Sequence, residues 1–154
     1  MATDRVIISL GNDILGDDGI ALSIGDILSE KTGIVNKKTN SFGFEIIEAV
    51  SGYKKIFFVD AVVIPDEKIG QVFTFDIEDF NKHLHLSSPH TFNLPTALKL
   101  LELYGQKPEL IKIYGINIPN ELKFSETFSE ELKKEIPEIV KYIFEDIKKA
   151  IDNY

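Results

Sequence analysis

The stretch VIISLGNDILGDDGIALSIGDIL, residues 6–28, decides the fold predicted for this chain. Its first five residues are mostly apolar and β-branched, and Gly11 ends them in a turn, which is typical of a short buried strand. From Asp18 onward the apolar residues recur with the period of a helix. The chain therefore runs from a strand through a glycine-rich loop into a helix. In open α/β sheets, ligands bind at such strand ends.

Two adjacent acids, Asp17 and Asp18, stand where this helix is predicted to begin. Acidic residues commonly cap helices and complement the positive end of the helix dipole, so a cap explains either residue taken alone. One acid is enough for a cap, however, and the second would then point into the glycine-lined crevice. Capping and chemistry both stay open for this pair on the local sequence.

Further along the chain, predicted strands alternate with predicted helices. Strands are expected at 34–39, 54–60, 71–75 and 110–116, and helices at 44–50, 96–104 and 129–151, with a short helix near 76–79. Four bulky apolar residues precede Asp60, which marks a central strand that ends at this acid. The strand at 71–75 follows through a short loop, so it is predicted to run antiparallel to its predecessor. Ser129 is a plausible cap of the last helix, which Pro137 either kinks or begins.

These elements predict an α/β fold, a three-layer α/β/α sandwich with a mixed, mostly parallel sheet of about five strands. A chain of 154 residues, 44% hydrophobic, suits one domain spanning 1–154. Its apolar runs are too short to cross a bilayer, and the first residues do not resemble a signal peptide, so a soluble cytoplasmic protein without membrane insertion is expected. The net charge of −8 argues against nucleic-acid binding. The absence of cysteine excludes disulfides and thiolate chemistry.

Three polar residues follow predicted strands or lie in loops beside the core: Asp18, Asp60 and His90. If the first and central strands are parallel neighbours, both carboxylates reach the same edge of the sheet. Two carboxylates and an imidazole suit partial coordination of a borderline metal such as nickel or zinc, or general acid–base catalysis. His83 and His85 are interpreted as surface residues. The chain has no H-E-x-x-H helix, no G-x-S-x-G elbow and no phosphate-binding P-loop.

The run GNDILGDDG, residues 11–19, resembles the G-N-x-x-x-x-D-[DE]-x-x-G signature of the nickel–iron hydrogenase maturation endopeptidases. The resemblance continues in order through most of the chain. Residues 59–61 (VDA) resemble the end of the family's central strand, and residues 88–90 (SPH) resemble its S-x-H loop. Residues 114–119 (YGINIP) are similar to its late strand and the turn that follows.

The resemblance implies a function and a site. Members of the family remove a C-terminal peptide from the precursor of the hydrogenase large subunit after nickel has been inserted. Asp18, Asp60 and His90 match the three positions that contact nickel, and Asp17 becomes the helix-capping acid. The nickel is carried by the substrate, so no permanent cofactor is expected. The family's fold is likewise a three-layer sandwich with a five-stranded, partly antiparallel sheet.

Three departures from the family pattern fall near the presumed substrate-docking turns. Ala21, Asn40 and Asn93 stand where glycines are usual. They leave room for a non-proteolytic, nickel-sensing relative with the same site. A phosphoacceptor receiver module is a further alternative, because such domains also place acids after early strands and a lysine after a late one. Here Lys112 lies inside its predicted strand, which weakens that alternative.

Overall fold

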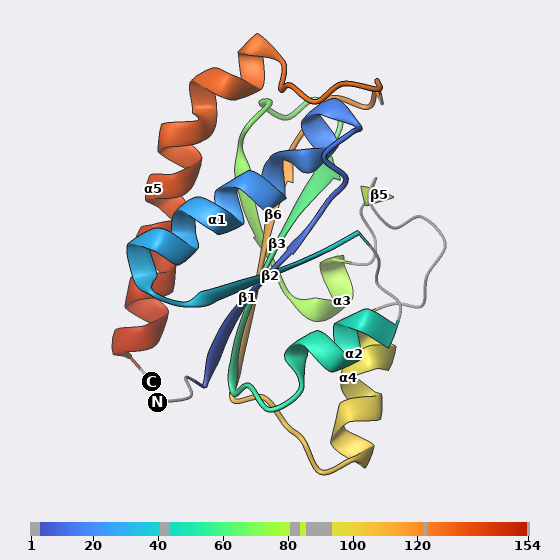
Figure 1. Cartoon of the computed structure of the whole chain (residues 1–154), viewed down its shortest axis with the longest axis vertical. Coiled ribbons are helices and arrows are strands. Elements are labelled where there is room, and N and C mark those ends of the chain that lie inside the picture. Colours follow the sequence, from blue (N-terminus) through green and yellow to red (C-terminus); the bar gives the residue numbers. More distant parts are fainter. Residues whose placement is uncertain (1–3, 41–43, 81–83, 86–93, 122, 154) are drawn as a thin grey trace.

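A mixed sheet runs through the middle of the structure, which is a computed structural model describing residues 4–40, 44–80, 84–85, 94–121 and 123–153 (Figure 1). Its strands are β1 (Arg5–Leu10), β2 (Val35–Thr39), β3 (Lys55–Val63), β4 (Val72–Phe75), β5 (Leu84–His85) and β6 (Leu110–Asn117). The spatial order is β2-β1-β3-β6-β4, and β5 pairs with β3. The four strands β2, β1, β3 and β6 are parallel, whereas β4 runs antiparallel to β6 and β5 antiparallel to β3.

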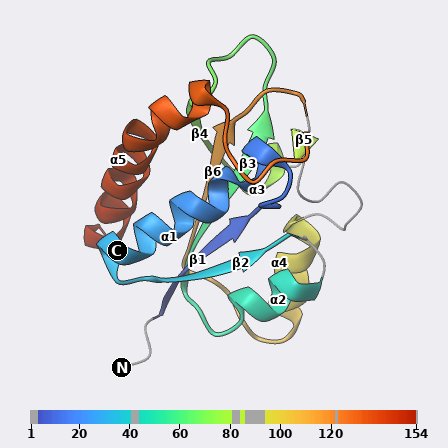
Figure 2. The same cartoon turned by 45° about the horizontal axis from the view of Figure 1, so that its top comes forward.

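Helices cover both faces of this sheet (Figures 1 and 2). They are the 3₁₀ turn η1 (Gly16–Gly19) and the helices α1 (Ile20–Thr32), α2 (Phe44–Val50), α3 (Ile77–Phe80), α4 (Leu94–Leu103) and α5 (Glu130–Asp152). In both views α1 and α5 lie on one face, and α2 and α4 lie on the other. None of the helices within the described part of the chain is long and apolar enough to cross a bilayer.

The core is divided by the alternation of side chains along the strands. Phe57 and Val59 of β3 pack with α1 and α5, and Ile56 and Phe58 pack on the opposite face with α2 and α4. All nine residues of β3 are buried. A strand covered on both faces reads as a continuous apolar run, which is why this segment is so clear in the sequence.

The predicted sandwich with its mixed sheet of about five strands is confirmed, with β5 as a two-residue addition. Two details differ from the prediction. The strand β4 does run opposite to β3, but its partner is β6, so the order along the chain is not the order in the sheet. The 3₁₀ turn η1 precedes α1, so the α-helix begins at Ile20 and not at Asp18. Pro137 lies inside α5, which begins directly after its cap Ser129.

The connections place a switch point between β1 and β3. From β1 the chain passes through α1 on one face to β2, whereas the chain that leaves β3 later passes through α4 on the other face to β6. Connections that leave adjacent strands toward opposite faces open a crevice outside the carboxyl ends of those strands. The loop after β1, which holds Asp18, and the second half of β3, which holds Asp60, both lie at this crevice.

Candidate active site

The loop after β1 folds tightly onto its own 3₁₀ turn. A Cβ atom at Gly11 would lie 2.5 Å from the carbonyl oxygen of Asp18, so only glycine fits where the loop begins. The backbone N–H of Asn12 donates to Oδ2 of Asp18 at 3.1 Å, and the Asn12 side chain accepts from the N–H of Ile14. This folding turns the Asp18 side chain inward, toward the end of the central strands.

Asp18 is fully buried, and its Oδ1 atom has no hydrogen-bond partner among the residues that the structure describes. The pKa of this carboxyl is raised to about 7, mainly by burial and further by the negative charge of Asp60, while the Asn12 hydrogen bond acts in the opposite direction. A buried carboxylate oxygen without a partner is costly in a folded protein. Such a group is a candidate for holding a ligand or transferring a proton.

Asp60 lies inside β3, and not at its end as the sequence suggested, because the strand continues to Val63. The pairing of β3 explains how a buried acid is tolerated there. On one side Asp60 pairs with Gly115 of β6. On the other side β1 pairs with β3 only as far as Val59, and β5 begins to pair at Val62. Asp60 is thus level with a gap between β1 and β5, and its Oδ1 accepts from the N–H of Ala61 at 2.8 Å.

The structure brings two of the three predicted site residues together, since the charge of Asp60 acts on Asp18. The third, His90, lies outside the described residues, as does His83. The backbone of His85 is described, in β5 opposite Val62. Within the described ranges no group of three histidine or acidic side chains is placed to hold a metal ion. The role predicted for these residues stays a prediction.

Asp17 does not cap α1, which corrects the role expected for it. The cap of α1 is Gly19, without a side-chain hydrogen bond, and the cap of η1 is Leu15, also without one. The Asp17 carboxylate instead accepts from the backbone N–H and from the hydroxyl of Ser129, both at 2.8 Å. No local sequence pattern predicts this contact, because the two residues are 112 positions apart.

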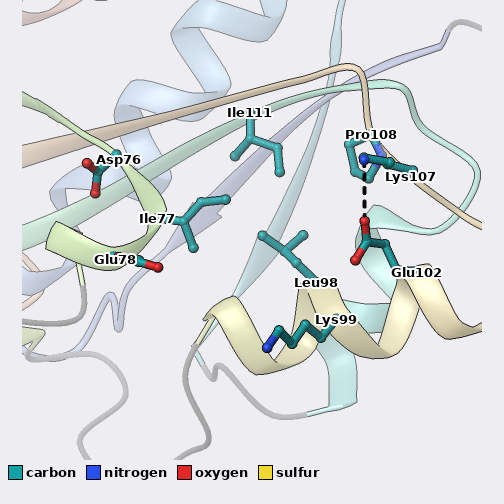
Figure 3. A pocket seen from close by; sticks show the side chains of 9 residues that line it. All are labelled: Asp76, Ile77, Glu78, Leu98, Lys99, Glu102, Lys107, Pro108 and Ile111. Atoms are coloured by element: carbon teal, nitrogen blue, oxygen red, sulfur yellow. Dashed lines mark ion pairs between the residues drawn. The ribbon is translucent and has the colours of Figure 1, made fainter.

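A separate cavity of about 520 Å³ opens between α3, α4 and the start of β6 (Figure 3). The side chains of Ile77, Leu98 and Ile111 line its apolar part, and an ion pair between Glu102 and Lys107 lies at its edge. Neither Asp18 nor Asp60 lines this cavity. It is therefore distinct from the carboxylate pair.

The contacts of Lys112 are with residues other than Asp18 and Asp60. Its amino group pairs with Asp146 of α5 at 3.6 Å, and its backbone pairs with Phe57, before Asp60 along β3. A receiver module needs its lysine beside the phosphate that the acids hold. The structure therefore does not favour the phosphoacceptor alternative.

Two interacting, buried carboxylates at a crevice between parallel strands define an α/β protein that can hold a cation or transfer a proton. Such a pair does not ionise fully at neutral pH without a counter-charge, because both charges lie in a poorly solvated place. One acid with a pKa of about 7 is also suited to general acid or base catalysis near neutrality.

Comparison with known proteins identifies the family. The model of the hydrogenase maturation protease family, HycI, matches residues 35–146, and the chain belongs to this family of peptidases. The matched segment includes Asp60 and His90, whereas the loop with Asp18 precedes it. No curated protein matches the chain.

Solved structures show the same fold. The hydrogenase maturating endopeptidase HybD from E. coli superposes with a TM-score of 0.75 at 19% identity, over 95% of this chain and 93% of that one. The [NiFe] hydrogenase maturation protease HybD from Thermococcus kodakarensis gives 0.68 at 26% identity, over 90% and 95%. The HycI protease from the same organism gives 0.65 at 25% identity, over 96% and 94%.

Proposed function

We propose that this protein removes the C-terminal extension from the large-subunit precursor of a nickel–iron hydrogenase after nickel has been inserted. Asp18, Asp60 and His90 contact the nickel that the substrate carries, and this contact places the scissile peptide bond in the site. Membership of the maturation protease family supports the class of reaction. The observation that carries the proposal is the buried Oδ1 of Asp18, which lacks a partner among the described residues and faces a second acid.

The electrostatics of the pair support a cation delivered by the substrate. Burial and the charge of Asp60 both oppose ionisation of Asp18, so a positive charge between the carboxylates would relieve both effects. Carboxylate oxygen is an acceptable ligand for nickel when an imidazole completes the set. The arrival of the substrate's metal would thus be coupled to loss of a proton from Asp18.

The position of β5 supports the inclusion of His90. The last residue of β5, His85, pairs with Val62, which is two positions beyond Asp60 on β3. His90 is five positions after His85, and five residue steps span at most about 18 Å when fully extended. The length of this segment is therefore compatible with a contact between His90 and a nickel ion held by the two carboxylates.

The chemical step is hydrolysis of a peptide bond by water. Two routes fit the residues: the carboxylate of Asp18 takes a proton from the attacking water, or the substrate's nickel polarises that water. In both routes the water oxygen bonds to the scissile carbonyl carbon, the C–N bond breaks, and the leaving amine takes up a proton.

The test is a mass-spectrometric cleavage assay on the large-subunit precursor encoded by the same genome, prepared with and without nickel. We expect wild-type protein to release a C-terminal peptide from the loaded precursor only, and Asp18→Asn to release none. The control is Asp13→Asn, which neutralises an exposed carboxylate in the same loop and should cleave like wild type. Equal cleavage of both precursors would contradict nickel recognition. Failure of wild type on a precursor that another maturation protease processes would contradict the proposed client.

A further inference from the structure

The N-terminus of α5 is fastened to the loop that carries Asp18. The carboxylate of Asp17 accepts two hydrogen bonds from Ser129, one from its backbone N–H and one from its hydroxyl, both at 2.8 Å. Ser129 is at the same time the cap of α5, because its hydroxyl oxygen accepts from the N–H of Leu132. The Asp17 side chain thus accepts from both hydrogen-bond donors of the residue that caps α5.

Backbone pairing reinforces the contact next to it. The N–H of Gly16 donates to the carbonyl of Ser125 at 2.8 Å, and the N–H of Ser125 donates to the carbonyl of Ile14 at 2.9 Å. Gly16 adopts a φ of 58°, which favours glycine, and this turn lets the loop meet residue 125 before entering η1. The segment before α5 therefore holds the loop at residues 14, 16 and 17, directly ahead of Asp18.

We propose that Asp17 is a positioning residue, which holds the loop against the N-terminus of α5 so that the neighbouring Asp18 keeps its buried orientation. The inference rests on the proposed function only where it concerns cleavage; its structural part stands on the contacts described above. Asp17 and Asp18 are consecutive residues of the turn η1, so a shift of the backbone at Asp17 also shifts Asp18. Asp17 itself touches Ser129 and has no assigned contact with the substrate.

A direct reporter of the Asp18 orientation exists in the molecule. The Asn12 N–H donates to Oδ2 of Asp18, so its hydrogen exchange measures whether that carboxylate stays in place. We expect Asp17→Ala to accelerate exchange of the Asn12 amide roughly tenfold, the scale of losing a charge-assisted hydrogen bond. The amide of Phe57, in the central strand β3, serves as the internal reference and should keep its wild-type rate.

Two variants of Ser129 separate the contact with Asp17 from the helix cap. Ser129→Asp keeps a good cap but replaces the hydroxyl donor by a like charge facing Asp17, so it should accelerate Asn12 exchange as Asp17→Ala does. Ser129→Thr keeps both the cap and the donor, so the Asn12 amide should exchange at the wild-type rate. The double variant Asp17→Ala with Ser129→Asp should show little more than either single change, because both remove one interaction.

The second readout is the split between kcat and KM for cleavage of the nickel-loaded precursor. Asp17→Ala should lower kcat roughly tenfold and raise KM as well, since Asp17 acts through Asp18, which in the proposed function both contacts the substrate's nickel and takes part in the cleavage step. Unchanged Asn12 exchange in Asp17→Ala, or acceleration of Phe57 together with Asn12, would overturn the positioning role. Absence of cleavage by wild type would count against the proposed function alone, because the exchange measurement needs no substrate.

Discussion

Asp18 and Asp60 are both fully buried, and the charge of Asp60 adds to burial in raising the pKa of Asp18 to about 7. They come from different parts of the chain and meet because β1 and β3 are parallel neighbours. At neutral pH the folded protein therefore carries Asp18 as a mixture of protonated and ionised forms. The unfolded chain would ionise this residue fully, since its ordinary pKa is 3.8.

This difference predicts a pH-dependent gain of stability in Asp18→Asn. Because the folded-state pKa is raised, the stabilising contribution of protonated Asp18 is complete below about pH 4 and is lost as the pH rises through 7. The variant has no such loss and keeps an oxygen for the Asn12 N–H. We expect it to be more stable than wild type at pH 8 by about 2–4 kcal/mol, and nearly equal at pH 4.

Urea unfolding of both proteins between pH 4 and 8 measures this difference. Asp13→Asn is the matched control, since it removes an exposed carboxylate from the same loop and should show a small difference at every pH. A wild-type protein that is as stable as Asp18→Asn at pH 8 would show that Asp18 is not held at a raised pKa.

His85 and His90 should differ in their importance for cleavage. We expect His90→Ala to lower the rate on nickel-loaded precursor by roughly 100-fold or more, since even the outer partners of metal ligands are worth 10–100-fold. His85→Ala, in β5 beside Val62, should stay close to wild type. Single-turnover cleavage followed by mass spectrometry distinguishes them, and a loss in His85→Ala alone would assign the third nickel contact to His85.

Asn117 is predicted to be a strong determinant of stability. It is buried, and its side chain accepts from the N–H of Ile64 while its amide donates to the carbonyls of Ile64, Glu67 and Lys68. Asn117→Ala would leave several of these groups without partners, at an expected cost of about 2–3 kcal/mol. Urea unfolding measures the cost, with Asn153→Ala at the exposed end of α5 as the control. Equal midpoints for the two variants would contradict the prediction.

Gly115, which pairs with Asp60, should not tolerate a side chain. A Cβ atom there would lie 2.5 Å from Cε2 of Phe75 and 2.9 Å from Cγ2 of Val62. We expect Gly115→Ala to destabilise the protein by about 1–3 kcal/mol, because these side chains must move in a packed interior. The double variant with Phe75→Leu should recover part of the loss in thermal unfolding. No recovery would indicate that the strain falls on Val62 and β3.

The periodicity of the sequence was sufficient for the sandwich, because both sheet faces are covered and each helix buries one apolar stripe. The exact span of α2, the cap at Ser129 and the strand β2 follow from local residues alone. The length of β3 does not follow from local residues, because an acid after four apolar residues normally marks the end of a strand. Distant pairing carries β3 through Asp60, because β6 pairs with it as far as Val62 and β5 pairs with Val62 and Val63.

In the candidate site, too, some residues could be predicted from the sequence and one contact could not. Asp18 and Asp60 could be selected as residues at strand ends, and the parallel pairing of β1 with β3 brings them together. The actual partner of Asp17 could not be predicted, because Ser129 is remote in sequence and its capping role already explained it. Helix capping by Asp17 was the natural local interpretation, and a tertiary hydrogen bond displaced it.

The buried acid pair also has a consequence for the history of such a chain. Two buried carboxylates, Asp18 in η1 and Asp60 in β3, lower the stability of every folded molecule, whether or not a substrate ever arrives. Replacing either with a neutral residue is expected to yield a more stable protein, so selection for stability would favour the loss of both. Only selection for activity opposes that loss. In a lineage that no longer has a client to process, these two positions would be among the first to change, while the sandwich around them persisted.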